Sequence, residues 1–369
     1  MLPRVSATVA IPKPDLQQVF DNLRGSRLRL IGPTVVDGAI ALGEIERTEQ
    51  LPIGWSDEQQ PGRYRAKQGA EKTYFAFNVG PHSWRRFLHP PRLTLFSAKA
   101  NGKMTIEHDG EEPPRYAFIG VRACDLQAIA VQDRVLMNGS YRDPQYVARR
   151  SNAFILAVNC TKAASTCFCT SMQSGPRVTG AFDLAATELP DVFVLDVGSE
   201  AGSQVLEGTS WASANAFDVG RATEAVQKAE RQITREVRTD HLGSLLFEHL
   251  ESPLWKEVSG RCLGCGNCTM VCPTCFCTTV VDTIDLSDRS ERIRVWDSCY
   301  TTDFSHVHGG NIRPSLRARY RQWVTHKFAA WREQFGVSGC VGCGRCITWC
   351  PVGIDITEVL KAFRSTGVK

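Results

Sequence analysis

The spacing of hydrophobic and polar residues divides the chain into two parts. Residues 1–240 carry short apolar runs bounded by Gly, Pro or Asn, and their length and β-branched content predict buried strands. These predicted strands are residues 73–77, 93–96, 116–121, 154–158 and 192–197. Helical spacing precedes and interrupts them, at Leu16, Val19, Phe20 and Leu23 and again over residues 124–137. Strand–loop–helix units of this kind predict an α/β fold for the first part.

The pattern becomes helical from about residue 220. Residues 221–237, 241–250 and 315–334 are rich in charge and have helical spacing. We therefore expect an α/β domain over residues 1–240 and a mostly helical domain over residues 241–369. No Pro/Ser/Gly-rich linker separates the two, so they are expected to pack together.

The composition is that of a globular protein. Over 369 residues, 43% are hydrophobic and 22% are charged, which excludes a disordered chain. No stretch approaches the about 18 unbroken apolar residues of a spanning helix, and the first residues lack the features of a secretory signal. We therefore expect a cytoplasmic protein with no membrane partner. Its fifteen cysteines should then be reduced, which favours metal binding or redox chemistry.

Two cysteine-rich segments in the second part repeat each other. Residues 262–273 read CLGCGNCTMVCP, and residues 340–351 read CVGCGRCITWCP. Both follow C-x2-C-x2-C-x3-C-P, the pattern of ferredoxins with two clusters, in which the fourth cysteine binds the other cluster. The predicted first ferredoxin site consists of Cys262, Cys265, Cys268 and Cys350. The predicted second ferredoxin site consists of Cys340, Cys343, Cys346 and Cys272.

Two 4Fe-4S clusters are the better interpretation of this repeat. Zinc ribbons also use paired C-x2-C motifs, but zinc gains nothing from a fourth Cys-Pro at a fixed distance in both copies. The 67 residues between Cys272 and Cys340 exceed the short connection of a compact ferredoxin, and their latter part has helical spacing. We therefore expect a ferredoxin-like domain with a long helical insertion between its motifs.

Four further cysteines lie in the first part, which is otherwise poor in cysteine. Cys124 and Cys160 each follow a predicted strand, and Cys167 and Cys169 lie in the loop after Cys160. If the two strands are parallel, their carboxyl ends meet at one edge of the sheet, where α/β proteins place ligands. These four cysteines form the candidate N-terminal site and are enough for a third 4Fe-4S cluster. Buried structural cysteines are the alternative.

The last three cysteines, Cys275, Cys277 and Cys299, receive no assignment from spacing. A ligand to the N-terminal site, packing around a ferredoxin cluster and a separate site all stay open for them. The tripeptide Cys-Phe-Cys occurs twice, at residues 167–169 and 275–277.

Other functional patterns are missing from the sequence. No G-x-G-x-x-G follows a predicted strand, and no G-x-x-x-x-G-K-[ST] or Ser-His-Asp pattern is found, so we expect no nucleotide site and no catalytic residue. The pair His306 and His308 is typical of a surface turn. The basic residues 83–92, SWRRFLHPPR, are interpreted as a docking loop or solvated face, because the overall charge is too small for nucleic-acid binding.

Several segments resemble the beta subunit of cytoplasmic NAD(P)-linked nickel–iron hydrogenases of the sulfhydrogenase type. They are GVRACDLQAI, AVNCTKAASTCFCTSM, RCLGCGNCTMVCPTCFC, WDSCYTTDFSHVHGGNIRP, RYRQWVTHKF and GCVGCGRCITWCPVGID. They lie roughly within residues 115–355, and the first 110 residues resemble the family only weakly. The A subunit of anaerobic sulfite reductase is similar in the same segments.

The resemblance implies an iron–sulfur electron-transfer subunit of a hydrogenase complex. In such complexes the hydrogenase large and small subunits carry the nickel–iron chemistry, and another subunit binds flavin and NAD(P). Those subunits are the implied partners, and the missing nucleotide motif agrees with this division. Electron transfer within an anaerobic sulfite reductase is the alternative function.

The formal net charge of +4 counts every cysteine as neutral. An oxidised 4Fe-4S cluster with its four thiolates carries about −2, so two clusters bring the total to about zero and three to about −2. The excess of Arg and Lys is therefore interpreted as charge compensation for bound clusters.

The third cluster leads to a prediction about metal content. Iron and acid-labile sulfide analysis of the anaerobically purified protein should return about twelve of each per chain, since each of three clusters holds about four. A result of about eight would contradict the third cluster and leave the two ferredoxin sites.

Overall fold

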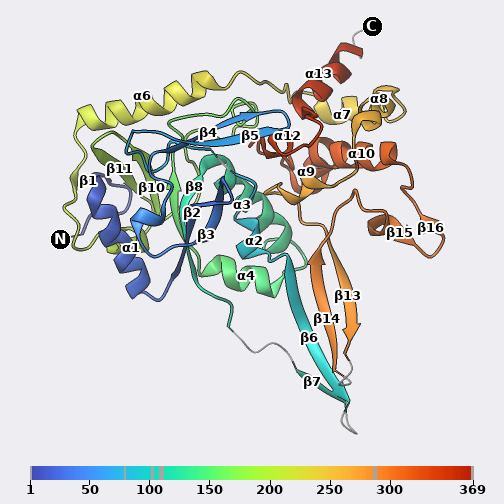
Figure 1. Cartoon of the computed structure of the whole chain (residues 1–369), viewed down its shortest axis with the longest axis horizontal. Helices are drawn as coiled ribbons and strands as arrows, with labels where there is room; N and C mark the ends of the chain where they lie inside the picture. The colour runs from blue at the N-terminus through green and yellow to red at the C-terminus, as the bar shows by residue number, and fades with distance from the viewer. Residues whose placement is uncertain (1, 79, 101–103, 108–111, 286–288, 367–369) are drawn as a thin grey trace.

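An eight-stranded mixed sheet forms most of the first part of the chain in the computed structural model, which describes residues 2–78, 80–100, 104–107, 112–285 and 289–366 (Figure 1). Its strands, in spatial order, are β12 (Ala212–Ser213), β1 (Thr8–Pro12), β11 (Val192–Val197), β10 (Leu184–Glu188), β9 (Phe154–Val158), β8 (Tyr116–Arg122), β2 (Arg29–Val36) and β3 (Ala39–Glu44). The central strands β10, β9, β8 and β2 are parallel to one another. Antiparallel strands extend the sheet on both sides.

The α/β interpretation of the first part is confirmed, with one error. The runs at 116–121, 154–158 and 192–197 lie in β8, β9 and β11, and the run at 93–96 lies within β6 (Arg92–Ala100). Strands β8 and β9 are buried along their whole length, as expected for parallel strands covered on both faces.

Residues 73–77 do not form the predicted strand. The backbone N–H groups of Tyr74 and Phe75 instead donate to the Glu188 carboxylate, both at 2.8 Å. The guanidinium of Arg122 donates to two carbonyl oxygens of the same segment at 2.7 and 2.6 Å. Side chains therefore satisfy backbone groups that a neighbouring strand would otherwise pair.

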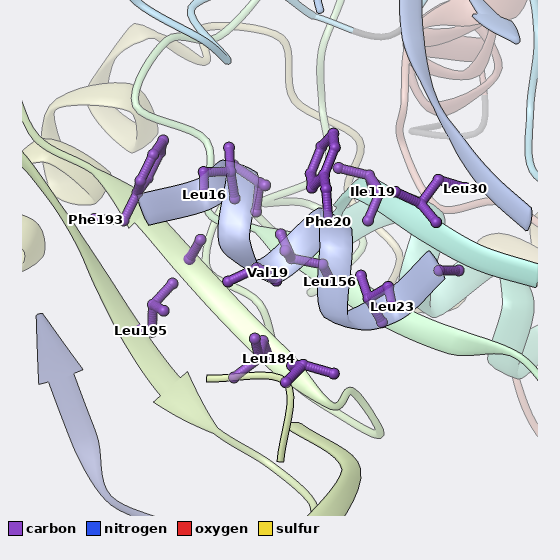
Figure 2. Packing of buried hydrophobic residues seen from close by; sticks show 14 of the residues in the cluster. Leu16, Val19, Phe20, Leu23, Leu30, Ile119, Leu156, Leu184, Phe193 and Leu195 are labelled. Carbon is purple, nitrogen blue, oxygen red and sulfur yellow. The ribbon is translucent and has the colours of Figure 1, made fainter. Parts of the chain in front are cut away.

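Helix α1 (Leu16–Gly25) packs its apolar face on the large sheet, as its spacing predicts (Figure 2). Its four buried residues contact apolar side chains from the central and antiparallel strands. The remaining helices of this part are α2 (Arg85–Leu88), α3 (Ala123–Leu136), α4 (Pro144–Ser151), α5 (Glu200–Gln204) and α6 (Ala216–Gln232), with 3-10 turns η1 (Lys13–Asp15) and η2 (Thr48–Gln50). A separate hairpin joins β4 (Trp55–Gln60) to β5 (Arg63–Gln68).

A second sheet is built from both parts of the chain. Its order is β13 (Thr278–Ile284), β14 (Arg289–Trp296), β6 and β7 (Met104–Glu107), and it extends away from the rest of the molecule (Figure 1). The segment between the two ferredoxin motifs is therefore not a helical insertion throughout. Its beginning is rich in β-branched residues, TTVVDTI, which fit a strand better than a helix.

The remainder of the second part holds helices and one short hairpin. The hairpin joins β15 (His306–Val307) to β16 (Gly310–Asn311) after the 3-10 turn η3 (Asp303–Ser305). The helical elements are α7 (Leu242–Glu248), α8 (Leu254–Arg261), α9 (Asn267–Met270), α10 (Leu316–Thr325), the π-helical turn η4 (His326–Ala330), α11 (Trp331–Phe335), α12 (Arg345–Thr348) and α13 (Ile356–Thr366). Within the described residues, none of the helices has the length and apolar character needed to cross a membrane.

Candidate iron–sulfur sites

The four cysteines of the N-terminal site line a single hollow. Cys124 lies in the first turn of α3, directly after β8, and Cys160 follows β9. The two strands are parallel, with Arg122 opposite Val158, so the prediction that their carboxyl ends share an edge is confirmed. The loop after β9 brings the remaining two cysteines to the same edge.

The thiols of this hollow are poor acids. Burial, followed by the charge of Cys160, raises the pKa of Cys167 to about 12. Burial also raises the pKa of Cys124 well above its usual value. Such thiols stay protonated at neutral pH as free groups, whereas metal ligands are thiolates, so metal binding in this hollow would release protons.

The four cysteines of the first ferredoxin site also line one hollow. Cys350 comes from the second motif, so the two motifs lie against each other as the exchange of fourth cysteines requires. Three aromatic residues, Tyr300, Tyr320 and Trp323, line the same hollow. The hydroxyl of Tyr320 and the indole N–H of Trp323 are buried, and neither has a hydrogen-bond partner in the part of the chain described.

Buried donors without partners are costly, and here they border a space enclosed by thiols. The donor set fits an anionic group with sulfur acceptors in that space, as a 4Fe-4S cluster has. Among the described residues, no three or more His, Cys, Asp or Glu side chains gather closely enough for a single metal ion. Thiols that surround a hollow suit a cluster better, because the cluster itself fills the space between its ligands.

The second ferredoxin site lies between the other two. Burial raises the pKa of Cys346 well above its usual value, and the charges of its predicted co-ligands Cys340, Cys343 and Cys272 raise it further. Cys346 also lines the hollow of the first ferredoxin site. Cys343 also lines the hollow of the N-terminal site. The three sites therefore form a continuous series with the second ferredoxin site in the middle.

The backbone of the second motif packs directly on the loop of the N-terminal site. A Cβ atom at Gly342 would lie 2.5 Å from the Phe168 carbonyl oxygen, and one at Gly344 would lie 2.5 Å from that of Thr166. Both glycines also have positive φ, of 64° and 76°. The Phe168 N–H donates to the Gly342 carbonyl oxygen at 2.9 Å. Only glycine fits at these two positions.

A buried ion pair joins the same two segments. The Arg345 guanidinium, in the second motif, donates to both Asp125 oxygens at 2.8 and 3.0 Å, and both side chains are 2% exposed. Burial alone would lower the pKa of Arg345, but Asp125 and then Cys343 outweigh it and the pKa rises. Asp125 follows Cys124 in the chain, so the pair lies between two predicted cluster sites.

The three unassigned cysteines lie around the ferredoxin sites. The Cys275 thiol contacts Cys272, and Cys299 lies beside Cys277. Cys299 also lies beside Cys268. None of the three lines the hollow of the N-terminal site. This placement favours packing around the ferredoxin sites over a ligand to the N-terminal site.

Two other sequence interpretations have different outcomes. His306 and His308 are exposed, as expected for a surface turn. The basic stretch at 83–92 is not a solvated face, because Trp84 and Arg85 are 2% and 4% exposed. The Arg85 guanidinium lies 3.5 Å from the ring centre of Trp296 and donates to the Cys275 carbonyl oxygen. Arg85 is therefore a buried residue that binds the backbone of the cysteine segment.

Several groups that surround the sites belong to no recognisable sequence pattern. Asp125 and Arg345 are 220 residues apart, and no spacing rule connects them. Lys327, in the turn η4, donates to the Cys272 sulfur at 3.3 Å and was hidden within a charged helical pattern. The buried donors of the first ferredoxin site, the Tyr320 hydroxyl and the Trp323 indole N–H, likewise belong to no sequence motif.

Comparison with known proteins agrees with this geometry. Residues 261–354 match the family model of a 4Fe-4S dicluster domain. Sulfhydrogenase 2 subunit beta of Pyrococcus furiosus is 32% identical over 289 residues, which cover 76% of this chain and 82% of that protein. No solved structure matches the chain.

The buried ion pair yields a stability prediction. Asp125→Asn leaves the Arg345 guanidinium buried without its carboxylate partner and should lower the free energy of unfolding by about 3–5 kcal/mol. The double variant Asp125→Leu/Arg345→Met removes both charges and should recover much of that loss. Urea unfolding followed by circular dichroism measures both effects.

The exposed pair Arg29–Glu44, with its closest atoms 2.6 Å apart, supplies the matched control. Glu44→Gln should change the free energy of unfolding by about 0–1 kcal/mol, because solvent screens an exposed pair. An Asp125→Asn protein as stable as the Glu44→Gln protein would show that the buried pair has no special role.

Proposed function

Because the chain belongs to the family of sulfhydrogenase beta subunits, the iron–sulfur electron-transfer subunits of hydrogenases, we propose that it carries electrons through three 4Fe-4S clusters in series. One end of the series would meet the nickel–iron subunits, and the other would meet a subunit that binds flavin and NAD(P). The chain would hold no catalytic residue of its own. Its place of action would be the cytoplasm.

The proposed ligands are the three sets of four cysteines derived from spacing and from the large sheet. One observation carries the proposal above all: Cys350 of the second motif lines the hollow of Cys262, Cys265 and Cys268. That exchange of a cysteine between motifs is characteristic of a dicluster ferredoxin and has no purpose in two separate zinc sites. The common hollow of Cys124, Cys160, Cys167 and Cys169 supports the third cluster in the same way.

The position of the second ferredoxin site supports a linear path. Cys346 borders the first ferredoxin site and Cys343 borders the N-terminal site, so each neighbouring pair of sites shares a lining residue. A bound 4Fe-4S cluster supplies a carrier for one electron. The chain's own residues hold the three sites at fixed separation and keep water from the middle one.

The first ferredoxin site is the proposed contact with one partner subunit. Cys265 is exposed, and Leu263 and Val352 beside the same hollow are 65% and 39% exposed. Apolar side chains around an exposed ligand suit a surface that a partner covers. The N-terminal site, where Cys160 and Cys167 are half-buried, is the proposed opposite end.

Cysteine variants test the ligand sets. Cys265→Ala, Cys343→Ala and Cys167→Ala should each lower the iron content by about four per chain, because each removes one ligand of a different cluster. Each should also stop electron transfer between hydrogen and NAD(P) in the assembled complex while leaving the nickel–iron centre intact. Cys277→Ala is the matched control and should keep all the iron. Full turnover in a variant that lacks the electron paramagnetic resonance signal of one cluster would contradict the linear path.

Purification of the native complex tests the partners. A tagged chain should bring with it a nickel-containing pair of subunits and a flavin-containing subunit, measured by mass spectrometry, nickel analysis and flavin fluorescence. A sirohaem-containing partner in place of nickel would contradict the hydrogenase assignment and indicate a sulfite reductase.

A further inference from the structure

Lys327 is a buried ammonium group surrounded by acceptors from the cysteine segment. Lys327 is only 6% exposed. The Nζ atom lies 3.3 Å from the Cys272 sulfur and 3.1 Å from the Thr274 hydroxyl. It lies 2.9 Å from the Gly339 carbonyl oxygen. The three N–H bonds of the ammonium therefore each have an acceptor, and one acceptor is a predicted cluster ligand.

No carboxylate pairs with Lys327 in the part of the chain that the structure describes. A buried charge is unfavourable unless an opposite charge compensates it. The groups at hand are the Cys272 and Cys275 sulfurs, the second at 3.7 Å. The negative charge that compensates Lys327 therefore comes from the thiolate of Cys272 and from the cluster that this thiolate would bind.

The local backbone is built around this contact. Lys327 lies in the π-helical turn η4, which interrupts the α-helical path from α10 to α11. Single π-helical turns are uncommon and occur frequently at functional sites, because the extra residue changes the direction of the side chains. Thr274 also donates to the Gly339 carbonyl oxygen at 2.7 Å, which fixes the two acceptors of the ammonium relative to each other.

Among the described residues, no cation donates a hydrogen bond to a ligand sulfur of the neighbouring first ferredoxin site. The charge of Arg319 acts on Cys262 from farther away, and its guanidinium donates to the Thr302 hydroxyl instead. The polar groups that line its hollow beside the cysteines are neutral: Tyr300, Tyr320, Trp323 and Asn267. Hydrogen bonds to the sulfurs and the net charge around a cluster both set its reduction potential. A full positive charge in hydrogen-bond contact with a ligand favours the reduced cluster, which carries one more negative charge.

We propose that Lys327 is a positioning residue that acts through Cys272 to raise the reduction potential of the second ferredoxin cluster above that of the first. The inference rests on the proposed function, since it requires a cluster at this site. The Cys275 thiol contacts Cys272 and lies 3.7 Å from the Lys327 Nζ atom, so it belongs to the same polar cluster around the ligand. The middle cluster of the series is then reduced before the first one and holds the electron between the two ends.

A redox titration followed by electron paramagnetic resonance tests this role on the purified complex. Lys327→Met and Lys327→Gln should shift the signal of the second ferredoxin cluster to lower potential and leave the other signals in place. The Gln side chain still donates to the Gly339 carbonyl oxygen, so it separates loss of charge from loss of packing. Lys327→Arg keeps the charge and should stay closer to the parent protein. Lys256→Met removes an exposed positive charge from α8 and should shift nothing.

Cys275→Ala should retain the full iron content and shift the same signal to lower potential by less than the lysine variants do. Loss of the second cluster from Lys327→Met and Lys327→Gln, with retention in Lys327→Arg, would also support the inference, because the cluster would then depend on the positive charge at this position. Neutral variants that load the cluster at the parent potential would overturn the inference, and so would loss of the cluster from all three lysine variants. Absence of the cluster from the parent protein would instead refute the proposed function.

Discussion

The architecture depends on a backbone contact that leaves no space for a side chain. Gly342 and Gly344 of the second ferredoxin motif lie against the carbonyl groups of Phe168 and Thr166 in the loop of the N-terminal site. The second motif thereby forms part of the wall of both neighbouring sites, through Cys346 on one side and Cys343 on the other. The separation of neighbouring sites is set by main-chain contact, which is stiffer than any contact between long side chains. A series of redox centres needs this fixed spacing more than it needs a cleft for substrate.

Charge is the second constraint on the same region. Burial raises the pKa values of several predicted ligand thiols, among them Cys124, Cys167 and Cys346, and buried cations lie near the cysteine segments. Arg345 has a carboxylate partner, whereas the countercharge of Lys327 comes from sulfur. Lys327 is thus a basic residue whose charge is compensated by a predicted cluster ligand and not by a carboxylate. The environments of the three sites differ, although their ligands are of one type.

The sequence was informative where a local rule governs the structure. The repeated cysteine spacing indicated the ferredoxin sites, and strand ends indicated that Cys124 and Cys160 share an edge. Residues 73–77 were assigned wrongly because their backbone pairs with Glu188 and Arg122, which lie far away in the chain. The same holds for Asp125 with Arg345 and for Lys327 with Cys272. Long-range polar contacts have no period in the sequence, so they emerge only once the fold is known.

The shared second sheet has a consequence for synthesis of the chain. Strand β6 pairs with β14, which the ribosome delivers about two hundred residues later. At roughly 5–20 residues per second, the edge of β6 waits on the order of ten to forty seconds for its neighbour. An unpaired edge during that time is a template for pairing with other nascent chains. The protein therefore reaches its final topology late, after the first ferredoxin motif has already left the ribosome, and slower translation between the two halves lengthens the period in which it is prone to aggregate.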